Sequence, residues 1–199
     1  MIKKLLCVGL SLILVMGFSG CGDIDEDTGG TLDEDVETTV NTEGDSVILS
    51  LFEELQDNEI MPFVLTEKAK VTLAEKENIF TGNRKDGLDE LTDTTLEYRA
   101  LTKNIDKYGD KLLYINEAYV VDISETELDE ETVATELQLL DAEENSYYCV
   151  SLSAYDNIFE EDIISIYALP IGETSFENVS GGTTLAIMLA GCYIEKCEY

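Results

Sequence analysis

The apolar residues of this chain follow two spacings, one before and one after about position 96. In the first part they recur every three to four positions, as they do on the buried face of an α-helix. A first short helix is predicted to begin after Ser46, which can cap it, and a second covers residues 66–79 with Thr66 as a suitable N-cap. Residues 81–93 are polar and contain two glycines, which predicts a loop.

Beyond this point apolar and polar residues alternate, which is the pattern of strands that bury one face. Glu117 interrupts the alternation of the first strand and predicts a bulge or a bend there. Leu169 and Pro170 are expected to end the fourth strand, because proline cannot donate a hydrogen bond to a neighbouring strand. The five predicted strands cover about residues 111–124, 136–139, 147–152, 162–168 and 185–194. They predict a mainly β fold, a small five-stranded barrel preceded by one or two short helices.

The second and third predicted strands form a hairpin. Residues 141–145 carry the turn signal between them, while an acidic loop at 125–131 and a glycine-rich turn at 178–182 separate other strands. In the third strand, Tyr148, Val150 and Leu152 alternate with Tyr147, Cys149 and Ser151.

The first 20 residues have the three-part layout of a bacterial export signal. Two lysines open it, an apolar run of 14 residues follows over 5–18, and small residues then lead to Cys21. The run is shorter than the roughly 20 apolar residues that a membrane-spanning helix needs. Residues 1–20 are therefore predicted to be a cleaved signal peptide.

The order Phe18-Ser19-Gly20-Cys21 resembles the lipobox of bacterial lipoproteins, in which a cysteine follows two small residues. Phe18 departs from that pattern, because Leu, Val or Ile is usual at its position. The resemblance implies a diacylglyceryl thioether on Cys21, and two acyl chains are enough for stable anchoring. The protein is then lipid-anchored at the cell membrane and faces the outside. An ordinary cleaved signal with an incidental cysteine is the alternative.

An acidic segment follows Cys21. Ten acidic residues and no basic one lie between positions 23 and 45, so residues 21–45 cannot bury enough apolar surface to offset their ordering entropy. They are predicted to be a disordered linker. An EF-hand calcium loop is the competing interpretation, with its positions 1, 3, 5 and 12 falling on Asp23, Asp25, Asp27 and Glu34. Thr28 stands where that loop needs glycine, and no helix is predicted on either side, so the linker is preferred.

The charge of the chain limits its partners. The formal net charge is −31, and the 12 basic residues are scattered without a cluster. Duplex binding depends on Lys and Arg neutralising phosphates, so no nucleic acid is expected as a partner. A neutral or cationic ligand fits better.

Few catalytic side chains are present. The chain has no histidine, the commonest general acid–base residue and a frequent zinc ligand. A pair of carboxylates could still act as in glycosidases. With 43 acidic residues, however, some pair falls at any spacing and carries no information. We expect no enzyme and no cofactor, with a carboxylate-type hydrolase as the less favoured alternative.

Four stretches carry a family resemblance: YRALTKNIDKYGD (98–110), YVVDISE (119–125), IFEEDIISIY (158–167) and 169–195, which contains LPIGETSFENVSGGTT and ends in CYIE. Together with LTEKAKVTLAEKENIF before them, they resemble the OB-fold domain of Gram-positive surface lipoproteins, related to anticodon-binding-like OB folds. Ala118 departs where glycine often bends the first strand, and Glu161 where glycine usually precedes Asp162. The resemblance implies a fold and a location, and no activity.

The chain is thus expected to comprise the signal peptide (1–20), the linker (21–45), a helical segment with a loop (46–95) and the OB-like barrel (96–199). OB folds bind ligands on the face of strands two and three. On that face we expect Glu136, Gln138, Tyr147 and Ser151, with Tyr155 in the following loop. Tyrosine amid carboxylates suits a sugar, a glycan or a cationic peptide; an ordinary solvated face is the plain alternative.

The expected function is that of a membrane-anchored interaction module whose ligand, an unknown protein, peptide or glycan, the sequence does not name. A structural or assembly role with another envelope protein is the alternative.

Three cysteines, Cys149, Cys192 and Cys197, follow Cys21. If one strand runs through the last two, their Cα atoms lie about 16 Å apart, whereas a disulfide needs roughly 4.4–6.8 Å. Because the third and fifth strands of an OB fold are neighbours, the resemblance makes Cys149–Cys192 the more plausible pair if a disulfide forms. Free thiols are the preferred interpretation.

Overall fold

The structure is a computed structural model that describes residues 46–56, 62–129, 132–177 and 182–198. The predicted signal peptide, lipid-bearing Cys21 and acidic linker lie outside the described residues, as does most of the predicted turn at 178–182. No helix of the described part is long and apolar enough to cross a membrane.

Two helices precede the strands, as predicted. Helix α2 spans Val47–Gln56, and the side chain of Ser46 accepts a hydrogen bond from the backbone N–H of Leu49. Helix α3 spans Glu67–Glu75, and Thr66 caps it by accepting from the N–H of Ala69. A 3-10 turn, η2 (Glu77–Ile79), completes the predicted 66–79 segment.

Two short helical elements were not predicted. Helix α4 (Tyr98–Lys103) and the 3-10 turn η3 (Ile105–Lys107) lie just before the first strand. They are too short to show a clear helical period in the sequence, and α4 buries only Leu101 completely.

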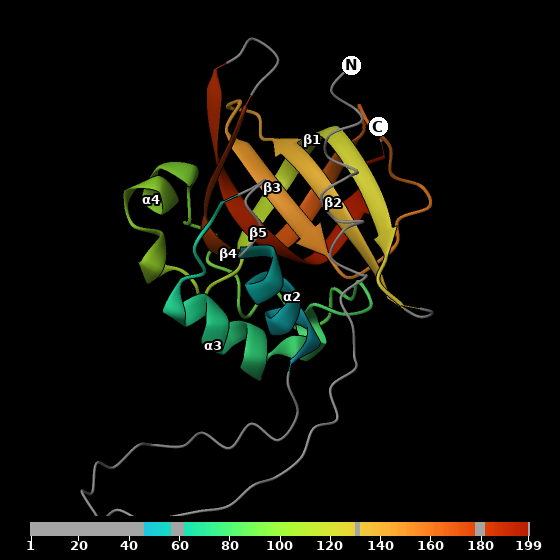
Figure 1. Ribbon diagram of the computed structural model, residues 1–199. Coiled ribbons are helices and arrows are strands. Elements are labelled where there is room, and N and C mark those ends of the chain that lie inside the picture. The colour runs from blue at the N-terminus through green and yellow to red at the C-terminus, as the bar shows by residue number, and fades with distance from the viewer. Residues whose placement is uncertain (1–45, 57–61, 130–131, 178–181, 199) are drawn as a thin grey trace, which may run out of the picture.

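Five strands form one sheet that closes on itself (Figure 1). The ring runs β1-β2-β3-β5-β4, and β4 pairs back with β1. All neighbours are antiparallel except β3 and β5, which are parallel. The strands are β1 (Leu113–Glu127), β2 (Val133–Leu140), β3 (Ser146–Ser151), β4 (Ile163–Glu177) and β5 (Thr183–Lys196).

The predicted irregularity at Glu117 is confirmed, since the pairing of β1 with β4 shifts between Ile115 and Ala118. A second shift lies between Val120 and Asp122 on the β2 side of the strand. Because the first shift changes which residues face inward, Ile115 is followed inside the ring by Ala118 and Val120, while Val121 is 42% exposed.

Two of the predicted strand ends are wrong. Strand β4 continues past Pro170 to Glu177, and its register shifts between Pro170 and Gly172. The bulge accommodates the proline within a strand whose pairing with β5 continues on both sides. Strand β1 also runs to Glu127, into the segment predicted as an acidic loop.

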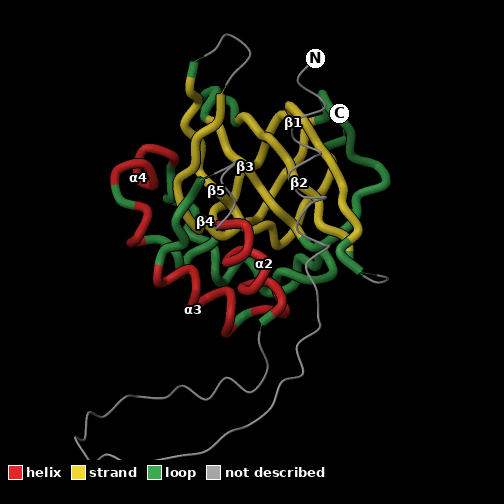
Figure 2. Tube along the Cα trace, in the orientation of Figure 1, coloured by secondary structure: helices red, strands yellow, loops and turns green. Residues whose placement is uncertain are grey.

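The sheet buries apolar residues on both of its faces. Alternate residues of all five strands form the cluster inside the ring. Leu96 and Leu101 from the segment before β1, and Tyr155 and Ile158 from the β3–β4 loop, belong to the same cluster. The opposite face of β3, β4 and β5 packs against the helical part, which Figure 2 shows gathered on one side of the strands. This outer cluster includes Tyr148, Met188 and Leu169 from the sheet and Phe52, Leu73 and Phe80 from the helical part. The helical segment and the strands therefore share one core.

Candidate functional site

The five predicted binding residues do not share a face. In the hairpin, Leu139 lies opposite Tyr147 and Leu137 opposite Cys149, and all four face the interior of the ring. Glu136 and Gln138, which alternate with those leucines, therefore point outward. The prediction that Tyr147 and Ser151 are exposed beside Glu136 is wrong, since they are 2% and 1% exposed. Successive residues of β3 point to opposite faces of the sheet, as predicted, but both of these faces are buried.

Glu136 bonds to a residue that was not predicted to be near a site. Its carboxylate accepts a hydrogen bond from the hydroxyl of Tyr148 on the outer face of the hairpin. Burial raises the pKa of Glu136 more than this bond lowers it, and the charge of Asp122 raises it further. The carboxylate is thus an internal partner of a buried tyrosine.

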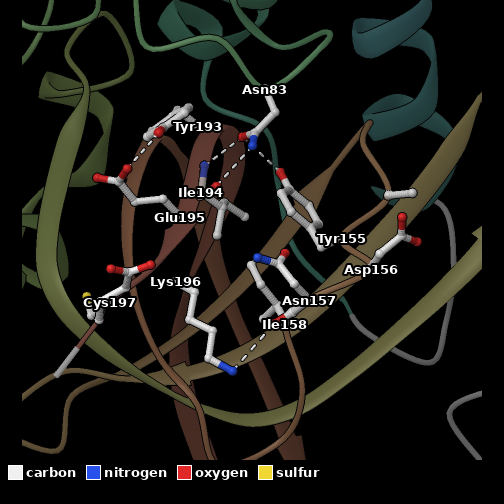
Figure 3. Close-up of a pocket in the computed structure, with 12 residues that line it drawn as sticks. Asn83, Tyr155, Asp156, Asn157, Ile158, Tyr193, Ile194, Glu195, Lys196 and Cys197 are labelled. Carbon is white, nitrogen blue, oxygen red and sulfur yellow. Dashed lines mark hydrogen bonds between the residues drawn. The ribbon is translucent and has the colours of Figure 1, made fainter.

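Ser151 and Tyr155 lie together. The Ser151 Oγ and Tyr155 Oη atoms are 2.8 Å apart, and the Tyr155 hydroxyl also donates to Asn83 Oδ1 over 3.3 Å. Tyr155 is only 6% exposed but lies at the wall of a hollow beside the end of β5 (Figure 3).

This hollow, the β5 basin, has a volume of about 990 Å³. It is lined by Asn83, residues 154–158 and residues 193–198. Asn83 links its two sides. The Asn83 side chain donates to the carbonyl of Ile194 over 2.9 Å and accepts from the N–H of Ile194 over 2.7 Å. Its backbone φ is +46°, a conformation that asparagine tolerates better than most residues.

Two charged residues that line the β5 basin, Glu195 and Lys196, form ion pairs with residues outside it. Glu195 accepts from the Tyr193 hydroxyl over 2.7 Å and forms an ion pair with Lys85 at 3.3 Å. The Tyr193 bond is the largest cause that lowers the pKa of Glu195. Lys196 lies 2.7 Å from an Asp162 carboxylate oxygen. These contacts tie the 81–92 loop and the β3–β4 loop to the sheet.

Tyr147 leads to a different hollow, which we call the tyrosine cleft. It has a volume of about 350 Å³ and lies between the start of β1, helix α4 and the β2–β3 turn. The Tyr98 and Tyr147 rings meet edge to face with their centroids 5.3 Å apart. The hydroxyl of Tyr147 donates to Asp141 Oδ2 over 3.0 Å.

Asp141 builds the turn beneath this ring pair. Its Oδ1 accepts from the N–H groups of Glu143 and Asn145, both over 2.9 Å, and its Oδ2 also accepts from the Asn145 amide over 2.8 Å. A carboxylate that accepts local backbone N–H groups is a common turn device. The predicted 141–145 turn is thus confirmed, and it fixes where the Tyr147 hydroxyl points.

The lining of the tyrosine cleft is acidic. Of its described lining residues four are acidic, namely Glu97, Glu117, Asp141 and Glu143, and none is basic. Burial raises the pKa of Tyr98 and of Tyr147, and the charge of Asp141 raises both further. The rings therefore lie in a field that disfavours more negative charge.

The possible bridge between Cys149 and Cys192 is absent from the structure. Cys149, Cys192 and Cys197 are free thiols. Cys149 belongs to the cluster inside the ring and Cys192 to the cluster under the helices, so the two side chains leave the sheet on opposite faces. Burial raises the pKa of both thiols.

Within the described part of the chain, no three histidine, cysteine or acidic side chains are placed to hold one metal ion. Sequence reasoning missed Asn83, Tyr98 and Asp141. The Gly82-Asn83 pair and the Asp141 turn carried a local turn signal, but nothing local showed which distant residue each would meet. Comparison with family models, with curated proteins and with solved structures gives no match.

Proposed function

We propose that this protein is a bacterial lipoprotein, anchored through Cys21, whose described part is an OB-like interaction module. The observation that supports the module best is the strand order: a five-stranded ring in which β3 and β5 are parallel neighbours, as in an OB fold. The irregularity in the long first strand agrees with the same resemblance.

The helical part changes where such a module can bind. OB folds commonly use the outer face of strands two and three. Here the outward residues Tyr148 and Val150 of β3 are buried against the helical part. Much of the usual face is therefore occupied within the chain, and the tyrosine cleft at the end of the hairpin is the better candidate for a ligand.

Anchoring is tested by lipid labelling. The whole chain is expressed in a bacterium with labelled palmitate beside the variant Cys21→Ser. We expect label in the parent and none in the variant, because the thioether needs the sulfur of Cys21. Equal label in both proteins would contradict the anchor.

Interaction is tested by capture from an envelope extract with residues 46–199 as bait. The matched control is the same bait after heat unfolding. Enrichment of a partner on the folded bait alone supports a binding module. Equal recovery on both baits speaks against it.

A role in assembly with another envelope protein is the second candidate. It is favoured by three exposed valines of the helical part, Val47, Val64 and Val71, which are 57%, 74% and 54% exposed. The variant Val64→Ser with Val71→Ser should lose the captured partner if these valines form the contact, and keep it if the tyrosine cleft does.

A further inference from the structure

We propose that the tyrosine cleft binds the guanidinium group of an arginine side chain in a cationic peptide. This inference deepens the proposed interaction module, on which it rests. Tyr98 supplies the aromatic surface, Glu143 the carboxylate at the rim, and Tyr147 with Asp141 the rigid floor.

The shape of the cleft fits one side chain. Its volume of about 350 Å³ is at the small end of the range for ligand pockets, about 300–1,000 Å³. Its walls are held in place, because the ring of Tyr147 packs edge to face on Tyr98 and its hydroxyl is bound to Asp141. The Tyr98 hydroxyl also lies 3.4 Å from the backbone carbonyl of Leu185 on β5. A ligand therefore meets ordered rings, and binding need not order them first.

Aromatic surface and negative charge coincide in this cleft, which selects for a cation. A cation over a tyrosine ring is attracted by the ring's quadrupole, and nearby carboxylates add to that attraction. Asp141 already accepts four hydrogen bonds, so it contributes charge more than contact. Glu143 is exposed at the mouth and can contact the ligand directly.

Arginine fits this combination better than lysine. Its planar guanidinium stacks on aromatic rings and is weakly hydrated, whereas an ammonium is a compact, strongly hydrated charge. Arg99, which does not line the cleft, already forms an ion pair with the lining residue Glu97. We therefore assign the direct contact with the ligand to Glu143.

The test uses the whole chain in uncharged detergent micelles, labelled with ¹³C in its tyrosine rings. The probe is the single-arginine peptide acetyl-Gly-Arg-Gly-amide, and the control probe carries citrulline, which has nearly the same shape without the charge. We expect saturable shifts of the Tyr98 and Tyr147 ring signals with the arginine probe and none with citrulline. A probe with one charge limits diffuse attraction to so acidic a protein.

Variants locate the binding. Tyr98→Leu should weaken the arginine probe about fivefold and Tyr98→Phe should retain it, because the ring and not the hydroxyl makes the contact. Glu143→Gln should weaken it about threefold, while Glu53→Gln removes the same charge from exposed α2 and should leave affinity within twofold. Glu143 and Glu53 are both exposed, so these two variants test the proposal even if Tyr98→Leu does not fold.

Equal effects of Glu143→Gln and Glu53→Gln, or shifts spread over all tyrosines, would mean diffuse attraction and overturn the cleft. Absence of any shift would overturn it as well. A chain that keeps its palmitate label and its captured partner but fails here remains an interaction module with a different site. If the chain carries no palmitate label and captures no partner but still binds the arginine probe, the proposed function is wrong and the arginine site in the cleft stands.

Discussion

At the scale of single residues, three non-glycine positions of the described part have a backbone that favours glycine or asparagine. Asn83, Glu144 and Glu161 have φ values of +46°, +62° and +72°. Glu144 and Glu161 are more costly there than Asn83, because a side chain with a β-carbon is disfavoured in this region by about 1 kcal/mol and asparagine is the better tolerated. The N–H of Glu161 nevertheless donates to the carbonyl of Val120 over 2.8 Å, which joins the turn to β1. Glycine, which the resemblance leads one to expect at this position, would adopt this φ without strain.

We expect Glu161→Gly to raise the free energy of unfolding by up to about 1 kcal/mol, or about 3 °C in Tm at this chain size. Thermal unfolding followed by circular dichroism measures it. Asp156→Gly removes the same charge from the same loop at a position without positive φ, so it should lower Tm instead. Similar shifts of the two variants would show that relief of negative charge, and not backbone strain, is the cause.

Glu136 carries a pH dependence whose sign follows from its raised pKa. A carboxyl group with a raised pKa in the folded chain binds its proton more tightly there than in the unfolded chain, where the usual value is 4.5. Between the two pKa values the free energy of unfolding therefore falls as the pH rises. At neutral pH the charged Glu136 destabilises the fold, and this effect disappears below the usual carboxyl pKa.

Glu136→Gln should therefore stabilise the protein at pH 7, since the amide oxygen can still accept from Tyr148. The gain should shrink as the pH falls through the raised pKa of Glu136 towards 4.5, and it should be absent below 4.5. Urea unfolding from pH 4 to pH 8 measures it, with Glu127→Gln at an exposed end of β1 as the control for general charge relief. A gain that is the same at every pH, or equal in both variants, would contradict the argument.

At the scale of elements, the helical segment completes the sheet. The outer faces of β3, β4 and β5 are apolar, and α2, α3 and the following segment cover them. Ile48, Phe52, Phe63, Leu73 and Phe80 are each at most 5% exposed. Burying a side chain of this size contributes about 1.5–3 kcal/mol, so the five together contribute about 7–15 kcal/mol. That sum matches the whole stability of a typical domain, about 5–15 kcal/mol.

Residues 96–199 alone should therefore not fold into a soluble monomer, whereas residues 46–199 should. Size-exclusion chromatography and near-ultraviolet circular dichroism of both fragments check this. A monomeric 96–199 fragment with a cooperative thermal transition would show that the strands are stable without their helical cover, as the predicted boundary near residue 96 implies.

At the scale of the whole molecule, the net charge of −31 dominates. Five basic side chains of the described part are held in ion pairs at separate places: Lys68–Asp110, Lys70–Glu67, Lys85–Glu195, Arg99–Glu97 and Lys196–Asp162. OB folds that bind single strands combine a basic groove with stacking aromatics. Here the rings of Tyr98 and Tyr147 lie instead among carboxylates.

We therefore expect no binding of single-stranded DNA or RNA at physiological salt. Stacking contributes about 1–3 kcal/mol per base, which does not overcome repulsion of each phosphate by this surface. Fluorescence anisotropy of a labelled oligonucleotide with residues 46–199 measures it. A saturable signal at low micromolar protein that weakens with salt would reveal a local basic site. It would contradict the expectation that the protein binds no nucleic acid.

The sequence by itself determined the elements whose signals are local. Ser46 and Thr66 begin α2 and α3 because each caps N–H groups three residues away. The five strands and the Asp141 turn follow from alternation and turn chemistry, and the break at Glu117 from its parity. Helix α4 was not predicted, because its six residues are too few to show a helical period. Strand β4 continues past Pro170 because a bulge in its pairing with β5 accommodates the proline.

Only the tertiary structure decided which face of each strand is covered. Alternation separates Tyr147 from Tyr148, but both are buried, because the ring encloses one and the helices cover the other. The same fact places Cys149 and Cys192 on opposite faces and splits the five predicted binding residues among three places. The tyrosine cleft joins Tyr98, Asp141 and Tyr147 from three elements. Such a site depends on how distant segments pack, and the physical forces that set this packing act between residues far apart in the sequence.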